Sequence, residues 1–251
     1  MLEKISTPLY NNSIVIDFFP EKHWYKIDWK FITSVTAITW IVDKSAPLMH
    51  RATGLVESTL HQYIDNWRVI DKEMITQARF EYKNVSKAAT DVWTLVHDRC
   101  EAFSKWVIKP MPADQQAQRC LKAFVEWTKA NNVKFLCAER YVYSKKHWYW
   151  WKCDYIAEVN WLKYLIDLKT SKWMYYLPYW MQTSGYKEAY EEETWDMLDW
   201  TMVLMLPKEE WYEFEVHYFE DPKADFVAFL WAFELLKRKK IVDKYEKEII
   251  K

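Results

Sequence analysis

Two aspartates and a lysine have types and spacing that could support hydrolytic chemistry. Asp154 lies in one short run of apolar and β-branched residues, and Asp167 and Lys169 lie at the end of the next run. A tight turn at Asn160-Trp161 would pair the two runs so that Asp154 directly opposes Asp167. Directly opposed Cβ atoms lie roughly 4.5–5.5 Å apart, so the two carboxylates would repel each other unless a cation lay between them.

Such a pair of carboxylates predicts a divalent cation held by oxygen ligands. Mg²⁺ and Mn²⁺ prefer this environment, and a bound divalent cation lowers the pKa of a water molecule. Lys169 follows Asp167 by two residues and so shares its face of the strand, where an ammonium group could neutralise a phosphate. Phosphodiester hydrolysis needs these components. From the residues alone, an exposed patch of paired Asp and Lys side chains is an equally good interpretation.

The elements that must position these residues follow from hydrophobic periodicity and turn signals. In the second half of the chain we expect strands over 133–143, 152–159, 162–168, 201–206 and 212–219, with helices over 176–193 and from Pro222. In the first half we expect strands over 13–19 and 25–33, with helices over 45–65, 71–82, 92–107 and 114–130. Thr90 and Asp91 are N-cap candidates for the helix over 92–107. This order predicts an α/β (α+β) fold with a central mixed β-sheet flanked by helices.

Bulk composition limits the class of protein. The chain has 251 residues, 51% of them hydrophobic, and a formal net charge of −1, so any phosphate-binding surface must be local. Without a signal-peptide core or a membrane-spanning apolar run, we expect a cytoplasmic protein with no membrane partner. The four cysteines contain no C-x-x-C pair, which predicts reduced core thiols and no iron–sulfur cluster. They are Cys100, Cys120, Cys137 and Cys153.

Tryptophan and glycine occur in unusual numbers. The chain has 17 Trp and only 2 Gly, although average usage of about 7% predicts roughly 18 glycines. Asp28-Trp29 and Asn160-Trp161 place tryptophan where Asp-Gly and Asn-Gly form tight turns. One hypothesis is that many of these tryptophans stand for glycine, through a genetic code that reads UGA as glycine. The alternative is a protein that is truly rich in tryptophan, with Trp127 an ordinary residue on the apolar face of a helix.

Five segments, in order along the chain, resemble motifs of the PD-(D/E)XK nuclease superfamily, and more closely its RecB-like, phage-type exonuclease branch. The core is Leu165-Ile166-Asp167-Leu168-Lys169-Thr170-Ser171-Lys172, which is similar to that branch's IDxKTS motif. The other four are Ser34-Val35-Thr36, Trp93-Thr94-Leu95-Val96-His97, Glu139 within a strand, and Gln182 to Tyr186. Trp93 and Trp151 stand where the family has glycine. The matching segments run from about Ser34 to Tyr186 and span over half of the chain.

The resemblance implies a restriction-endonuclease-like core with an N-terminal helical region. We expect one domain over 1–251, mainly helical over 1–130, with the catalytic sheet over 133–220 and a C-terminal helix over 222–251. The implied metal ligands for Mg²⁺ or Mn²⁺ are His97, Asp154, Asp167 and the backbone carbonyl of Leu168. The implied catalytic residues are Asp154, Asp167, Lys169 and Glu139. The residues implied to support the site or contact DNA are Gln182, Tyr186, Thr170 and Lys172.

The function expected from the resemblance is a metal-dependent DNA exonuclease in recombination or repair of a phage or mobile element. Its partner would be DNA ends, single- or double-stranded, with a homo-oligomer or a recombinase or helicase as a further possible partner. A structure-specific endonuclease or resolvase is the alternative within the superfamily. The alternative from another class is a non-catalytic, aromatic-rich module that binds nucleic acid or carbohydrate, because 18% of the residues are aromatic.

Overall fold

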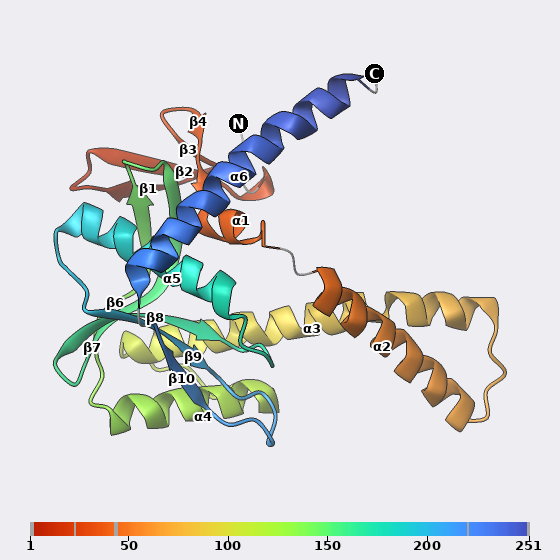
Figure 1. The fold of residues 1–251 in the computed structure, drawn as a ribbon. Coiled ribbons are helices and arrows are strands. Elements are labelled where there is room, and N and C mark those ends of the chain that lie inside the picture. Colours follow the sequence, from red (N-terminus) through yellow and green to blue (C-terminus); the bar gives the residue numbers. More distant parts are fainter. Residues whose placement is uncertain (1–2, 23, 43–44, 220, 250–251) are drawn as a thin grey trace.

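A computed structural model describes residues 3–22, 24–42, 45–219 and 221–249. A mixed β-sheet occupies the centre of the molecule, with helices on both faces (Figure 1). The spatial order of five strands is β10-β9-β8-β7-β5, and β6 also pairs with β7. The strands are β5 (Thr33–Ser34), β6 (Lys134–Ser144), β7 (Tyr149–Val159), β8 (Leu162–Lys169), β9 (Trp200–Met205) and β10 (Glu215–Tyr218). The predicted fold class is therefore confirmed.

Alternation of side chains along the strands divides the core into two layers. On β8, Ile166 and Leu168 pack beneath α3 (Lys72–Ser104) and α4 (Gln115–Ala130), in a cluster that contains Val96 and Phe124. Leu165 points to the other face, into a cluster with residues of three further helices. These helices are α1 (Val35–Thr39), α5 (Tyr176–Thr194) and α6 (Pro222–Ile249). The site residues of β8 thus lie on a strand that is covered on both faces.

The β7–β8 hairpin has the register that the sequence predicts. Val159 pairs with Leu162 across the two-residue turn, and the same register continues to Tyr155 and Ile166. β9 pairs with β8 in parallel, because α5 crosses the sheet between them. β8 therefore has a neighbouring strand on each side, β7 and β9. Its last residues lie at the end of the strand that leads into α5.

The first 31 residues add a small sheet that the sequence predicts only in part. Its strands are β1 (Ile5–Leu9), β2 (Ile14–Phe19), β3 (Trp24–Ile27) and β4 (Lys30–Phe31), and the short helix η1 (Pro20–Lys22) follows β2. β1, which contains Pro8, is not among the strands expected from the sequence; proline is tolerated there because β1 is an edge strand. Ile16 and Ile27 of this sheet pack against Tyr143 and Trp150 of the central sheet.

The prediction of two helices over 71–82 and 92–107 is wrong, because the chain forms the single helix α3. Its N-cap is Asp71, whose side chain accepts from the N–H of Met74 at 2.8 Å. The hydroxyl of Thr90 donates to the backbone carbonyl of Ser86 within the helix, so it is not a cap. With α2 (Ser45–Asp65), the first part of α3 extends away from the sheet as a helical hairpin (Figure 1).

The remaining helices match the expectations closely. α4 begins after Asp114, which caps it through the N–H of Ala117, and Trp127 packs against Phe214 in the core. α6 is described as far as Ile249, so the last two residues of the expected C-terminal helix lie outside the described part of the chain. All four cysteines are free, and three of them are buried. Within the described residues, no helix is long and apolar enough to cross a bilayer.

Candidate active site

The site begins where β7 and β8 separate. Tyr155 and Ile166 form the last backbone-paired positions of the hairpin, and Asp154 and Asp167 are the next residues on each strand. The Asp154 carboxylate accepts a hydrogen bond from the backbone N–H of Leu168 at 2.7 Å. At this position the Asp154 side chain accepts the hydrogen bond that a backbone carbonyl accepts elsewhere in the β7–β8 pairing. Asp154 is thereby fixed at the opening between the two strands.

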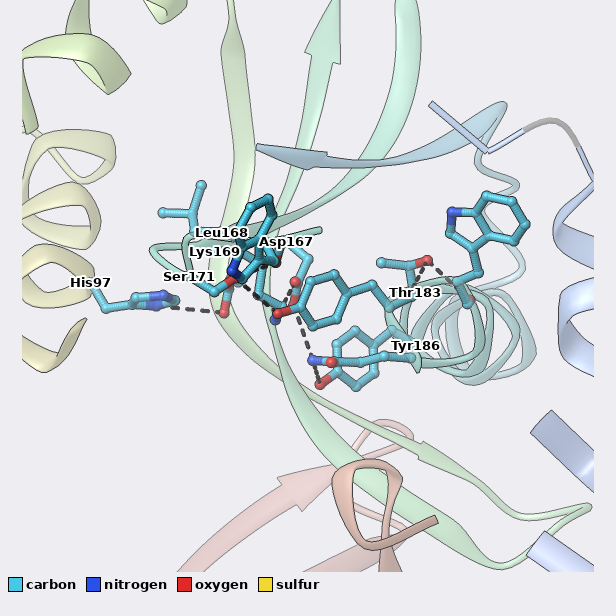
Figure 2. Close-up of polar contacts among 12 residues, drawn as sticks. His97, Asp167, Leu168, Lys169, Ser171, Thr183 and Tyr186 are labelled. Atoms are coloured by element: carbon cyan, nitrogen blue, oxygen red, sulfur yellow. Dashed lines mark hydrogen bonds and ion pairs between the residues drawn. The ribbon is translucent and has the colours of Figure 1, made fainter. Parts of the chain in front are cut away.

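His97 reaches this opening from α3. Its Nδ1 atom lies 3.7 Å from Oδ1 of Asp154 and 3.8 Å from Oε1 of Glu139. One potential ligand atom from each of these three residues lies within 4.8 Å of the others, a spacing that a metal ion could bridge. Val96 and Cys100 anchor this part of α3 in the core and direct the imidazole toward the sheet. Figure 2 shows His97 projecting from α3 toward the end of β8.

Glu139 occupies an unusual backbone conformation on β6. Its φ is 54°, a left-handed value that a glutamate rarely adopts, and its neighbours Ala138 and Arg140 remain paired with β7. The side chain forms ion pairs with Lys152 and His97. Strained residues persist where the surrounding structure holds them, and they are concentrated at functional sites. The geometry therefore favours a functional role for Glu139 over a surface glutamate on a regular strand.

Asp167 and Lys169 form a second group beside this cluster. The side chain of Lys169 is ion-paired with Oδ2 of Asp167 and lies 4.9 Å from the centre of the Tyr179 ring. From α5, the amide nitrogen of Gln182 donates to Oδ1 of Asp167 at 3.1 Å and to the hydroxyl of Tyr186 at 2.7 Å. Figure 2 shows α5 presenting Tyr186 to the carboxylate from the side opposite His97. Gln182 and Tyr186, four residues apart, thus lie on the same face of α5.

Burial controls the charge states in the site. Burial raises the pKa of Asp154 to about 6, and the nearby Asp167 adds to the rise, whereas His97 and Lys169 oppose it. Burial alone would lower the pKa of His97, but Asp154 and Glu139 outweigh it and the pKa is raised. The pKa of Lys169 is also raised, because Asp167 and Asp154 outweigh the effect of burial. The amine of Lys169 is therefore a cation throughout the neutral range.

The donor set fits a divalent cation. Two carboxylates supply hard oxygen ligands, which Mg²⁺ and Mn²⁺ prefer, and one imidazole supplies a nitrogen ligand, which suits softer transition metals. Among the described residues, Nε2 of His97 and Oδ2 of Asp167 are buried without a hydrogen-bond partner. Oδ2 of Asp167 has Lys169 as an ion-pair partner, which compensates its charge but leaves it without a well-oriented hydrogen bond. A cation would also offset the repulsion between Asp154 and Asp167.

The structure changes the emphasis of the predicted ligand set. The sequence places Asp154 and Asp167 first as ligands, whereas the three-residue cluster of ligand atoms contains Asp154 with His97 and Glu139. Asp167 lies beside that cluster and is held by Lys169 and Gln182. The N–H of Leu168 already bonds to Asp154. The role of its carbonyl in the metal site stays a prediction.

A cleft of about 1740 Å³ opens onto the site. Sites for small molecules have volumes of roughly 300–1,000 Å³, so this cleft has room for part of a polymer. Its lining includes His97, Glu139, Asp154, Asp167, Lys169, Gln182 and Tyr186. The expected DNA contacts Thr170 and Lys172 also line it, and the Lys172 amine lies over the rings of Trp173 and Tyr212, at 5.3 and 5.4 Å.

Three further basic residues of the cleft were not singled out from the sequence. Lys152 pairs with Glu139, and its position two residues before Asp154 on one strand is a signal that could have identified it. Arg51 of α2 and Lys208 of the β9–β10 loop also line the cleft. Burial, together with the charge of Arg51, lowers the pKa of Lys208. No local pattern relates these two residues, because they come from segments far apart in the chain.

Comparisons with known proteins leave the interpretation to the geometry of the site. No known protein family matches the chain, and no curated protein matches it.

Proposed function

We propose that this chain is a divalent-metal-dependent deoxyribonuclease of the PD-(D/E)XK type. One observation carries the proposal: His97, Glu139 and Asp154 bring three ligand atoms within 4.8 Å of one another, beside the amine of Lys169, in a large cleft. A structural ion-pair network would not require an open cleft, a strained glutamate or a buried imidazole nitrogen without a hydrogen-bond partner. The ordered motifs of the sequence support the same proposal.

In the proposed reaction, His97, Glu139 and Asp154 would hold the metal ion, and Asp167 would be a further ligand from β8. A bound divalent cation supplies a Lewis acid for a phosphate oxygen and lowers the pKa of a nearby water molecule. Lys169 would stabilise the negative charge that develops on the phosphate, because its amine is cationic and only partly exposed to solvent. Gln182 keeps the Asp167 carboxylate in position, and Tyr186 in turn keeps Gln182 in position.

The proposed substrate is DNA. The cleft exceeds the volume of a small-molecule site, and Lys172, Arg51 and Lys208 could contact phosphates along it. Local positive charge of this kind is needed because the net charge of the whole chain is only −1. Exonuclease action at free ends, in recombination or repair of a phage or mobile element, follows from the family resemblance and forms part of the proposal.

A digestion assay tests the proposal. Linear DNA should be degraded with Mg²⁺ or Mn²⁺ and remain intact with a chelator, and Asp167→Asn should abolish degradation while folding persists. Glu158→Gln is a matched control, because Glu158 lies on the same hairpin but is paired with Lys134 at the far end of β7. Degradation by Asp167→Asn at the rate of the wild type would disprove the assignment of the site. Binding of DNA without any cleavage by the wild type would favour a binding module.

A circular substrate separates the two kinds of nuclease. An exonuclease requires an end and should leave covalently closed DNA intact, whereas an endonuclease or resolvase would cut it. Cleavage of the circle at a rate similar to that of the linear form would replace the proposed exonuclease by the endonuclease alternative.

A further inference from the structure

Several tryptophans have a backbone conformation that normally requires glycine. Among the described residues, six tryptophans have positive φ: Trp29 (66°), Trp67 (55°), Trp106 (58°), Trp148 (63°), Trp161 (72°) and Trp195 (58°). A bulky side chain at positive φ is a genuine outlier, because its Cβ approaches the backbone carbonyl too closely. Neither Gly54 nor Gly185 has positive φ. The conformations that glycine serves are thus occupied by tryptophan in this sequence.

Two of these tryptophans lie in two-residue hairpin turns. Asp28 and Trp29 connect β3 to β4 with φ values of 46° and 66°. Asn160 and Trp161 connect β7 to β8 with φ values of 49° and 72°. Turns of type I′ need positive φ at both central residues, and Asn-Gly and Asp-Gly are their preferred sequences. The first residue of each turn matches this preference, and only the second departs from it.

Two more lie at the ends of α2 and α3. The N–H of Trp67 donates to the carbonyl of Ile64, and the next N–H, that of Arg68, donates to the carbonyl of Tyr63. Trp106 and the residue after it repeat this pattern at the end of α3. The pattern is the Schellman motif, in which the left-handed residue is usually glycine and sometimes asparagine.

Helix α4 provides an internal comparison. It ends in the same hydrogen-bond pattern, and there the left-handed position is held by Asn132, with a φ of 49°. Asparagine is one of the residues that tolerate this conformation. Trp195 ends α5 in the left-handed region as well, with its N–H donating to the carbonyl of Glu191. The backbone at these helix ends is ordinary, and the tryptophan side chains are the exceptional feature.

Five of the six tryptophan side chains bury little of their surface. Their exposed fractions lie between 81% and 95%, for Trp29, Trp67, Trp106, Trp161 and Trp195. Tryptophan is highly buried on average, as Trp150 is here, with only 2% of its surface exposed. Trp148 differs from the five, because its indole N–H donates to the carbonyl of Phe31 at 3.2 Å.

We propose that the functional protein carries glycine at positions 29, 67, 106, 161 and 195, and that its gene specifies these residues by UGA codons read as glycine. The proposal accounts for the backbone conformation and the exposure together, and it supplies five of the glycines that the composition lacks. It also means that these five exposed indoles form no surface for stacking bases or sugars, so the binding module suggested by aromatic content loses part of its basis. The proposal is independent of the nuclease activity.

The gene and the natural protein provide the first test. We expect UGA at the five positions and UGG at Trp150, whose indole is stacked on Tyr141 in the interior. Peptide mass spectrometry of protein purified from its own host should give glycine masses for the five residues. UGG codons at these positions, or peptides with tryptophan masses, would overturn the proposal.

Thermal unfolding provides the second test, on protein made with the sequence as written. Trp161→Gly and Trp67→Gly should each raise the midpoint by roughly 2–8 °C, because glycine relieves the left-handed strain at these positions. Trp161→Ala should raise it less, because alanine keeps the Cβ atom. The matched control is Trp231→Gly: Trp231 is 74% exposed but lies within α6, so glycine there should lower the midpoint. A lower midpoint for Trp161→Gly and Trp67→Gly would contradict the proposal.

Discussion

At the scale of single residues, the site combines the buried Asp167 with two partly buried acids and one partly buried amine. Asp167 and Lys169 compensate each other's charge, and Asp154 is held by the backbone of Leu168. The alternation of positions along β8 was sufficient to predict that Asp167 and Lys169 share a face. The left-handed Glu139 could not be predicted, because no local rule places a glutamate in that conformation.

The Lys169 amine should act on the reaction more than on DNA binding. We expect Lys169→Met to lower the cleavage rate by about 10²–10³-fold, the usual cost of removing one group that stabilises developing charge. Affinity for DNA, measured by fluorescence anisotropy in Ca²⁺, should change far less. Lys163→Met is a suitable control, because Lys163 lies on the same strand and pairs with Asp196 outside the cleft. Equal cleavage rates for the Lys169→Met protein and the wild type would contradict the assigned role.

Asp225, in the first turn of α6, should make stability depend on pH. Burial and the neighbouring Asp221 raise its pKa to about 6. A carboxyl group with a raised pKa in the folded state binds protons more tightly than it does in the unfolded chain, so its cost to stability appears as pH rises from about 4 to 6. Asp225→Asn should therefore raise the unfolding midpoint at pH 8 and leave it nearly unchanged at pH 4. An equal gain at both pH values would exclude titration of Asp225 as the cause.

At the scale of elements, α3 links the site to the helical hairpin. The hydrophobic pattern predicts helix on both sides of Thr90, but two good capping residues suggested a break that the chain does not make. Without glycine or proline between 72 and 104, the helix continues, and Thr90 bonds back to Ser86. His97 therefore lies on one rigid element about 50 Å long by its residue count.

A proline substitution distinguishes one continuous helix from two. Asp91→Pro should destabilise the protein by about 3 kcal/mol, because it removes a hydrogen bond inside α3 and introduces a clash with the preceding turn. Gln115→Pro is the matched control, because Gln115 is the first residue of α4, where proline is tolerated. Chemical denaturation of the two variants measures the difference. If Asp91→Pro were as stable as Gln115→Pro, a helix boundary at 90–91 would be correct after all.

At the scale of the whole molecule, segments that are far apart in the sequence converge on one cleft. The order of strands and helices predicts the mixed sheet, and the motifs predict which residues of α3, β6, β8 and α5 meet. Sequence reasoning misses Arg51 and Lys208, because the tertiary fold alone brings α2 and the β9–β10 loop to the cleft. Local register relates Asp154 to Asp167, whereas the contacts of His97 with Asp154 and Glu139 depend on packing.

Lys208 should contribute to DNA binding through phosphate contact. Lys208→Ala should weaken binding to a similar extent for different DNA sequences. It should also make the slope of log K against log salt concentration shallower by about one unit. Lys237→Ala is the control, because Lys237 lies on α6 and outside the cleft. Binding isotherms at several salt concentrations give both quantities. An unchanged slope for Lys208→Ala would place the DNA elsewhere.

The central claim is that His97, Glu139 and Asp154 hold a divalent cation, and titration calorimetry with Mn²⁺ tests it most directly. The wild type should show one saturable site at pH 7.5, with a weaker signal at pH 5, because the pKa of Asp154 is raised to about 6 and binding requires the carboxylate. Asp154→Asn should lose that site, whereas Glu158→Gln should keep it. Binding by Asp154→Asn with the affinity of the wild type would contradict the account.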